Sequence, residues 1–181
     1  MGQGLRVGIM GGTFDPPHRT HLDLALAAQE AFKLDQVLFI PNARNPLRRI
    51  GPKASPKDRF RMVKLLVEGH EGLAVSDIDL GRSGPSYSVD TVRDLSQVMP
   101  ADFWWILGSD AAKQLEEWHD VEKLAKMTRF AVAIRPPDTK EMVLRHVPER
   151  LHPALDFMDF PASKRSSTAI RENLGLGRDE G

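Results

Sequence analysis

Short apolar runs alternate with helix-forming segments along almost the whole chain, and this alternation limits the possible folds more than any other feature. The runs have strand length and cover residues 5–10, 37–40, 73–76, 103–107, 130–134 and 155–160. Strand and helix in this order indicate a parallel sheet with helices on both faces. We therefore expect an α/β protein with a Rossmann-like, doubly wound, mostly parallel sheet.

The segments between the runs place apolar side chains at helical spacing. The expected helices cover residues 22–32, 60–66, 89–95, 111–124 (with a break near His119), 140–146 and 166–174. In doubly wound sheets, ligands bind beyond the carboxyl ends of the strands, where the strand order reverses. The functional loops are therefore expected at residues 11–18, 41–50, 77–87, 108–118 and 135–137.

Length and composition bound the remaining possibilities. The 181 residues suit a single domain over 1–174 with a flexible tail over 175–181. Equal numbers of basic and acidic residues, 25 each, argue against a general nucleic-acid or membrane-surface binder. The absence of cysteine excludes thiolate zinc sites and cysteine nucleophiles. With no membrane span or signal peptide apparent, we expect a soluble cytoplasmic protein; the oligomeric state cannot be derived from the sequence.

The stretch GGTFDPPHRTH, residues 11–21, directly follows the first apolar run. Glycines let backbone N–H groups approach a ligand, and a helix N-terminus binds anions. His18 and His21 are three residues apart and share one face of the expected helix. The pattern matches neither a P-loop nor a G-x-G-x-x-G turn. It favours a phosphate site over the alternative of a tight turn with surface histidines.

This stretch resembles the GTFDP…HxGH signature of the nucleotidylyltransferase superfamily, and SSTAIR at 166–171 resembles the second signature of that superfamily. Two further stretches, GPSYS at 84–88 and GSD at 108–110 followed by Trp118, are similar to the bacterial nicotinate-nucleotide adenylyltransferases. The resemblance covers about residues 5–174. One departure is Thr20, which stands where the superfamily usually has glycine.

The resemblance implies transfer of the adenylyl group of ATP to nicotinate mononucleotide, giving nicotinate adenine dinucleotide and pyrophosphate in NAD biosynthesis. The nucleophile would be a phosphate monoester, which is mostly dianionic at pH 7, so no strong general base is needed. Mg²⁺ would be held mainly by substrate phosphates, with no metal site on the protein. Nicotinamide mononucleotide or phosphopantetheine as the acceptor, and a non-catalytic nucleotide-binding module, remain alternatives.

The resemblance also implies roles for residues on the ATP side. Backbone groups of the first motif would contact ATP, and the side chains of later residues would hold its phosphates. The full ATP-binding set is Gly11, Gly12, Thr13, Phe14, His18, His21, Arg135, Ser167, Thr168 and Arg171. Within this set, His18, His21 and Arg171 are the expected catalytic residues. Asp15 is expected to shape the turn, because a carboxylate beside phosphates would repel them.

The acceptor side is expected to use Asn42, Arg48, Tyr87, Ser88, Asp110 and Trp118. Tyr87 and Ser88 begin a helix whose free N–H groups suit the nicotinate carboxylate. Trp118 would stack on the pyridine ring, and core packing is its alternative. Asp110 would bind ribose hydroxyls, and a helix cap is its alternative. Arg48 would bind phosphate, and a solvated loop position is its alternative.

Overall fold

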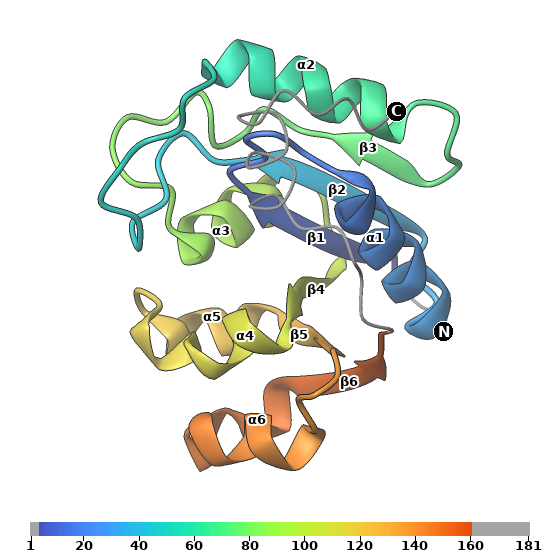
Figure 1. Cartoon of the computed structure of the whole chain (residues 1–181), viewed down its shortest axis with the longest axis vertical. Coiled ribbons are helices and arrows are strands. Elements are labelled where there is room, and N and C mark those ends of the chain that lie inside the picture. Colours follow the sequence, from blue (N-terminus) through green and yellow to red (C-terminus); the bar gives the residue numbers. More distant parts are fainter. Residues whose placement is uncertain (1–3, 161–181) are drawn as a thin grey trace.

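The computed structural model describes residues 4–160, and its centre is a six-stranded sheet (Figure 1). The strands are β1 (Arg6–Gly12), β2 (Gln36–Pro41), β3 (Leu73–Val75), β4 (Asp102–Gly108), β5 (Arg129–Ile134) and β6 (Leu155–Asp159). Their spatial order is β3-β2-β1-β4-β5-β6, and every neighbouring pair is parallel. The predicted doubly wound parallel sheet is confirmed.

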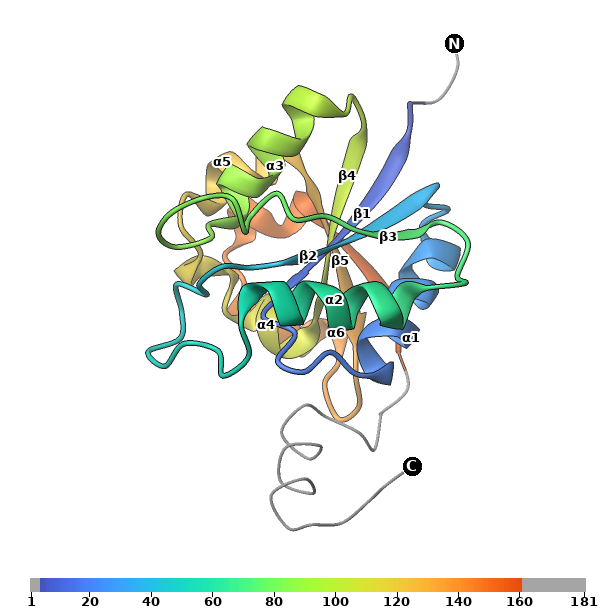
Figure 2. The same cartoon turned by 90° about the horizontal axis from the view of Figure 1, so that it is seen from above.

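Helices cover both faces of this sheet (Figure 2). One face packs against α1 (Arg19–Ala31) and α2 (Pro56–Val67). The other face packs against α3 (Ser88–Val98), α4 (Ser109–Lys113), α5 (Val121–Met127) and α6 (Lys140–His146). The 3₁₀ segments η1 (Leu115–Glu117) and η2 (Glu149–Ala154) add to the second layer. The sheet is therefore buried between two apolar cores, as its continuous apolar strands require.

The helix predicted over 111–124 has the predicted break near His119, but it is divided into three short pieces. The chain forms α4, η1 and α5 there, and Asp120 enters α5 from a left-handed conformation with φ of 49°. Leu115 and Val121 are both buried, but their spacing of six residues does not return to the same face of one helix. The chain therefore has to turn between them in order to bury both. The segment η2 was not anticipated, and the predicted helix over 166–174 and the tail over 175–181 lie outside the described residues.

β1 and β4 are hydrogen-bonded neighbours at the centre of the sheet. Successive strands are added on one side of this pair from β1 to β3, and on the other side from β4 to β6. Trp105 of β4 lies against the end of β1 so closely that a Cβ on Gly11 would be 2.5 Å from its Cζ2 atom. Gly11 is thus required by close packing inside the sheet. The carboxyl ends of β1 and β4 form the switch point at which such folds bind ligands.

Candidate functional site

The turn from β1 into α1 brings the two motif histidines together. Gly11 and Gly12 are the last residues of β1, whereas the sequence analysis placed them after it. His18 is the N-cap of α1, and its side chain accepts a hydrogen bond from the Thr20 backbone N–H at 3.2 Å. His21 Nδ1 accepts from the His18 backbone N–H at 3.1 Å. The two imidazole rings stack with centroids 3.9 Å apart, at the N-terminus of a helix.

His21 is neutral in the free protein. Its pKa is lowered from 6.5 to about 3, mainly by burial and in addition by electrostatic interactions with His18 and Arg135. Because Nδ1 accepts a hydrogen bond, the proton of the neutral ring is on Nε2, which is therefore a donor. The sequence analysis expected the histidines to stabilise phosphate charge. The structure makes His21 a dipolar hydrogen-bond donor rather than a fixed cation.

The side chain of Phe14 packs against the imidazole ring of His21. Phe14 is 3% exposed, and its ring packs edge-on against the imidazole of His21 with the ring centroids 5.0 Å apart. The Phe14 ring also contacts the ring of Phe39. The Phe14 backbone has a φ of 52°, which is an uncommon conformation for a residue other than glycine. The Phe14 side chain thus belongs to the core, and only its backbone is available to a ligand.

Arg135 reaches the histidines from the end of β5. Its guanidinium lies 5.5 Å from the centroid of the Phe160 ring, and its charge contributes to the lowered pKa of His21. Its Nε atom is buried and has no hydrogen-bond partner among residues 4–160. His18 and His21 therefore stack on each other after β1, and Arg135, which follows β5, is near enough for its charge to act on His21. Thr20 lies in the same turn and is buried, with 3% of the residue exposed.

Thr13 and Asn42 join the ends of β1 and β2. The Thr13 hydroxyl donates to Asn42 Oδ1 at 3.4 Å, and the Asn42 backbone N–H donates to the Gly12 carbonyl at 2.8 Å. Asp15 accepts hydrogen bonds from the backbone N–H groups of Lys53 at 2.7 Å and Ala54 at 3.2 Å. Asp15 thus shapes the turn, as predicted, by tying it to the loop after β2.

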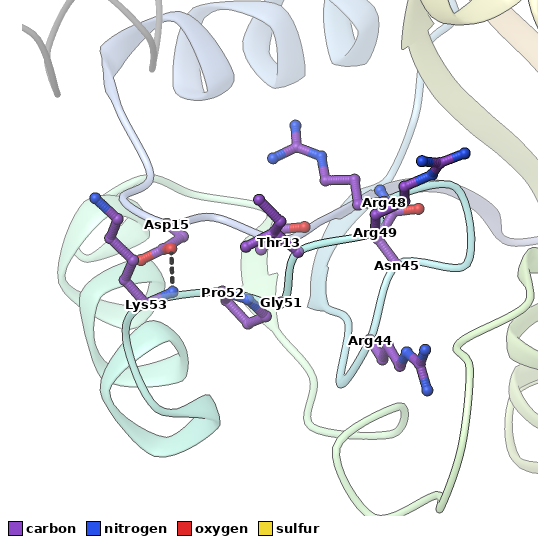
Figure 3. Close-up of a pocket in the computed structure, with 10 residues that line it drawn as sticks. Thr13, Asp15, Arg44, Asn45, Arg48, Arg49, Gly51, Pro52 and Lys53 are labelled. Carbon is purple, nitrogen blue, oxygen red and sulfur yellow. Dashed lines mark hydrogen bonds between the residues drawn. The ribbon is translucent and has the colours of Figure 1, made fainter.

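A basic cavity of about 510 Å³ opens between the turn after β1 and the loop after β2 (Figure 3). Thr13 and Asp15 line one side, and the loop contributes Arg44, Asn45, Arg48, Arg49, Ile50, Gly51, Pro52 and Lys53. The cations outnumber the single carboxylate, so the cavity favours an anionic ligand. Arg44, Arg48 and Arg49 all line this cavity (Figure 3).

Tyr87 and Ser88 begin α3, as predicted, with Tyr87 as the N-cap. The loop before them is fixed to the loop after β2, because Ser86 Oγ accepts from the Ala43 N–H at 3.0 Å and the Ser86 N–H donates to the Arg44 carbonyl at 2.9 Å. The Tyr87 ring stacks on His119 at 4.2 Å. The sequence analysis assigned no partner to His119, because a contact between two loops leaves no periodic signal.

Trp118 is partly buried and packs edge-on against Trp105 at 5.8 Å and Phe130 at 6.3 Å. It combines a core contact with a face near the carboxyl end of β4. Asp110 lies in the first turn of α4 with its side chain 94% exposed and 3.5 Å from Lys113 Nζ. The alternative of a helix cap for Asp110 is wrong, because Gly108 holds the N-cap position.

Arg59 is a residue of this region that the sequence analysis missed. It belongs to α2, is completely buried, and donates to backbone carbonyls of the loops after β1 and β2. Burial lowers the pKa of its guanidinium, and the charge of Asp15 opposes this effect. A signal was available, since Arg59, Val63 and Val67 are spaced at four residues and share the buried face of the helix.

Three predicted residues, Ser167, Thr168 and Arg171, lie outside the described residues. Within residues 4–160, no group of three or more histidine, cysteine, aspartate or glutamate side chains is placed to hold a metal ion. Over the same range, no helix combines the length and the apolar character that crossing a bilayer requires.

Comparisons with known proteins agree with this geometry. The sequence profile described as cytidylyltransferase-like matches residues 9–173. A probable nicotinate-nucleotide adenylyltransferase of Synechococcus sp. (strain JA-3-3Ab) is 40% identical over 97% of this chain and 86% of its own length. A probable nicotinate-nucleotide adenylyltransferase of Shouchella clausii (strain KSM-K16) is 38% identical over 96% of this chain and 86% of its own.

Solved structures show the same fold. The nicotinic acid mononucleotide adenylyltransferase of Plasmodium falciparum, complexed with NaAD, superposes with a TM-score of 0.79 at 18% identity, over 97% of this chain and 86% of that one. A putative nicotinate-nucleotide adenylyltransferase of Vibrio parahaemolyticus superposes with a TM-score of 0.64 at 18% identity, over 97% and 90%.

Proposed function

The chain belongs to the cytidylyltransferase-like family and, within it, to the nicotinate-nucleotide adenylyltransferases, and from this membership we propose that it joins ATP to nicotinate mononucleotide. A phosphate oxygen of the mononucleotide attacks the α-phosphorus of ATP. The bond from that phosphorus to the oxygen bridging to the β-phosphate breaks, and pyrophosphate leaves. The product is nicotinate adenine dinucleotide, and the compartment we propose for this step of NAD biosynthesis is the cytoplasm.

The observation that carries this proposal is the stacked pair of His18 and His21 at the N-terminus of α1, with the charge of Arg135 acting on His21. The positive end of the helix dipole favours the triphosphate there, while the N–H groups of Thr20 and His21 are used within the cap by His18. Arg135 supplies a full positive charge, and the Nε2–H of His21 supplies a hydrogen bond. Both are available when negative charge moves toward the leaving pyrophosphate, so they stabilise the transition state without transferring a proton.

The acceptor is proposed to lie across the basic cavity, between the loops after β2 and β3. Asn42 and Arg48 would hold its phosphate and ribose, and the first turn of α3 at Tyr87 and Ser88 would face the nicotinate carboxylate. The partly buried ring of Trp118 offers an aromatic surface for the pyridine. The hydrogen bonds of Ser86 to the neighbouring loop keep these two loops together and support one shared pocket.

We propose Mg²⁺ as the companion of ATP. The nearest carboxylate, Asp15, is occupied by the backbone N–H groups of Lys53 and Ala54, so the described residues fit a metal held by phosphate oxygens and water. Such an ion neutralises part of the triphosphate charge. Ser167, Thr168 and Arg171 stay proposed phosphate contacts on the strength of the second signature.

Pyrophosphate release tests the proposal. Protein, ATP and Mg²⁺ are mixed with nicotinate mononucleotide, nicotinamide mononucleotide or phosphopantetheine in separate reactions. We expect the fastest release with the nicotinate nucleotide. His18→Ala should reduce the rate by at least about tenfold. Arg19→Ala is the matched control, because the exposed Arg19 guanidinium pairs with Asp23 on the surface of the same helix. ATP binding without pyrophosphate release in any of the three reactions would reject catalysis in favour of a nucleotide-binding module.

A further inference from the structure

Arg59 is buried and donates to backbone carbonyls that follow β1 and β2, the two strands whose ends carry the proposed half-sites. We infer that it is a positioning residue, whose guanidinium holds the end of β1 against the end of β2 and so sets the distance between ATP and its acceptor. This inference rests on the proposed function and deepens it. It concerns a residue that no motif in the sequence includes.

The hydrogen bonds of Arg59 converge on three segments. Its Nη1 atom donates to the Thr13 carbonyl at 2.7 Å and to the Asn42 carbonyl at 2.7 Å. Its Nε atom donates to the Ala54 carbonyl at 3.3 Å. Thr13 follows β1, Asn42 follows β2, and Ala54 closes the loop that lines the basic cavity. A planar guanidinium offers N–H groups in fixed directions, so one side chain fixes three chain segments relative to one another.

Packing alone does not account for an arginine at this position. The residue is 0% exposed, its hydrogen bonds go to carbonyl oxygens, and the Asp15 carboxylate is the charge that opposes its own. Its Nη2 atom has no hydrogen-bond partner in the described part of the chain. Burying a guanidinium is unfavourable, because the attraction of a nearby carboxylate does not fully replace its hydration. A methionine or leucine would fill the inner face of α2 without that cost. The arginine is therefore explained by what it holds in place.

The held segments carry residues of both half-sites. Gly12, Thr13 and Phe14 belong to the turn proposed to contact ATP, and Asn42 belongs to the acceptor side. Reacting atoms must approach to about 3–3.5 Å, and a misplacement of about 1 Å can reduce the rate by about 100-fold. A change in the separation of the two strand ends should therefore reduce kcat more than it weakens the binding of either substrate alone.

The test compares Arg59→Met and Arg59→Lys with Arg61→Met and Arg61→Lys. Arg61 is exposed on the same helix and is the matched control. Three quantities are measured at 10 °C in a stabilising osmolyte: the folded fraction from urea unfolding, the Kd of ATP and of the mononucleotide separately, and kcat from pyrophosphate release.

For Arg59→Met we expect kcat per folded molecule to fall by about 10- to 100-fold, with each separate Kd changed less than about threefold. Arg59→Lys should recover part of kcat, because one ammonium group keeps the charge but cannot reproduce the planar fork. Both Arg61 variants should match the wild type.

Three outcomes would overturn the inference: an unchanged kcat per folded molecule, a loss explained by weaker binding of one substrate, or variants that do not fold even under these conditions. The named function is tested separately by wild-type turnover. If another acceptor is the better substrate, the variant ratios are measured with that acceptor, so either conclusion can fail while the other stands.

Discussion

Acid should destabilise this protein through His21. The pKa of His21 is about 3 in the folded protein and about 6.5 in the unfolded chain. As the pH falls below about 6.5, the unfolded chain takes up a proton that the folded protein refuses. The free energy of unfolding should therefore decrease by about 1.4 kcal/mol per pH unit down to about pH 3, and this contribution should be constant above about pH 6.5. At pH 4.5 the loss from this one group amounts to about 2.7 kcal/mol.

Urea unfolding at pH 7, 6, 5 and 4.5 measures this effect when the wild type is compared with His21→Gln. Glutamine cannot titrate, and the other titrating groups are common to both proteins, so their contributions cancel in the difference. The wild type should lose about 2.7 kcal/mol more than His21→Gln between pH 7 and 4.5.

Parallel pH curves for the wild type and His21→Gln would refute the reasoning. They would mean that the imidazole is protonated in the folded protein near its ordinary pKa, and that Nδ1 does not accept from the His18 N–H in solution. The proposed role of His21 as a neutral donor to the triphosphate would then fall as well. Proton NMR of the His21 ring gives an independent reading, because its resonances should not shift between pH 8 and 5.

Three further substitutions test separate parts of the structure. Asp79 is buried and accepts from Arg82 and from the Thr91 hydroxyl, so Asp79→Ala should lower the free energy of unfolding by about 3 kcal/mol in urea unfolding; a loss below about 1 kcal/mol would contradict this. Trp118→Ala should raise KM for nicotinate mononucleotide by at least about tenfold with little effect on KM for ATP in steady-state kinetics, while Trp118→Phe should stay near the wild type. Thr20→Gly should keep or improve kcat/KM for ATP but cost about 1 kcal/mol in thermal or urea unfolding, and a large loss of kcat/KM would show that the hydroxyl has a positive role.

The fold could be predicted from the sequence because each strand is a continuous apolar run and each helix has its own spacing. These are local signals, and they survive into the structure from β1 to β6. The break near His119 was predicted, but the further division of 111–124 at Gln114 was not, because the burial of both Leu115 and Val121 overrides helix propensity. The spacing of apolar residues within one helix does not predict where the chain must turn so that two helical pieces pack against the same core.

Within the candidate site, only contacts between residues of the same sequence motif could be predicted. The rings of His18 and His21 stack because the two residues are three positions apart at the start of one helix, and this spacing can be read from the sequence. The neutrality of His21 depends on burial and on the charge of Arg135 from another strand, so no local pattern contains it. The stacking of Tyr87 on His119 joins two loops and is equally invisible in the sequence.

The contact between Gly11 and Trp105 has a consequence for how this family can diverge. The indole ring of Trp105 occupies the space that the Cβ of a larger residue at position 11 would need. The side chains at positions 11 and 105 therefore cannot both be large. Across related sequences, a larger residue at position 11 should occur only together with a smaller one at position 105. A motif glycine can therefore be retained for the sake of a neighbouring strand, and a graft of the GGTFDP stretch into another sheet would need a compatible partner strand.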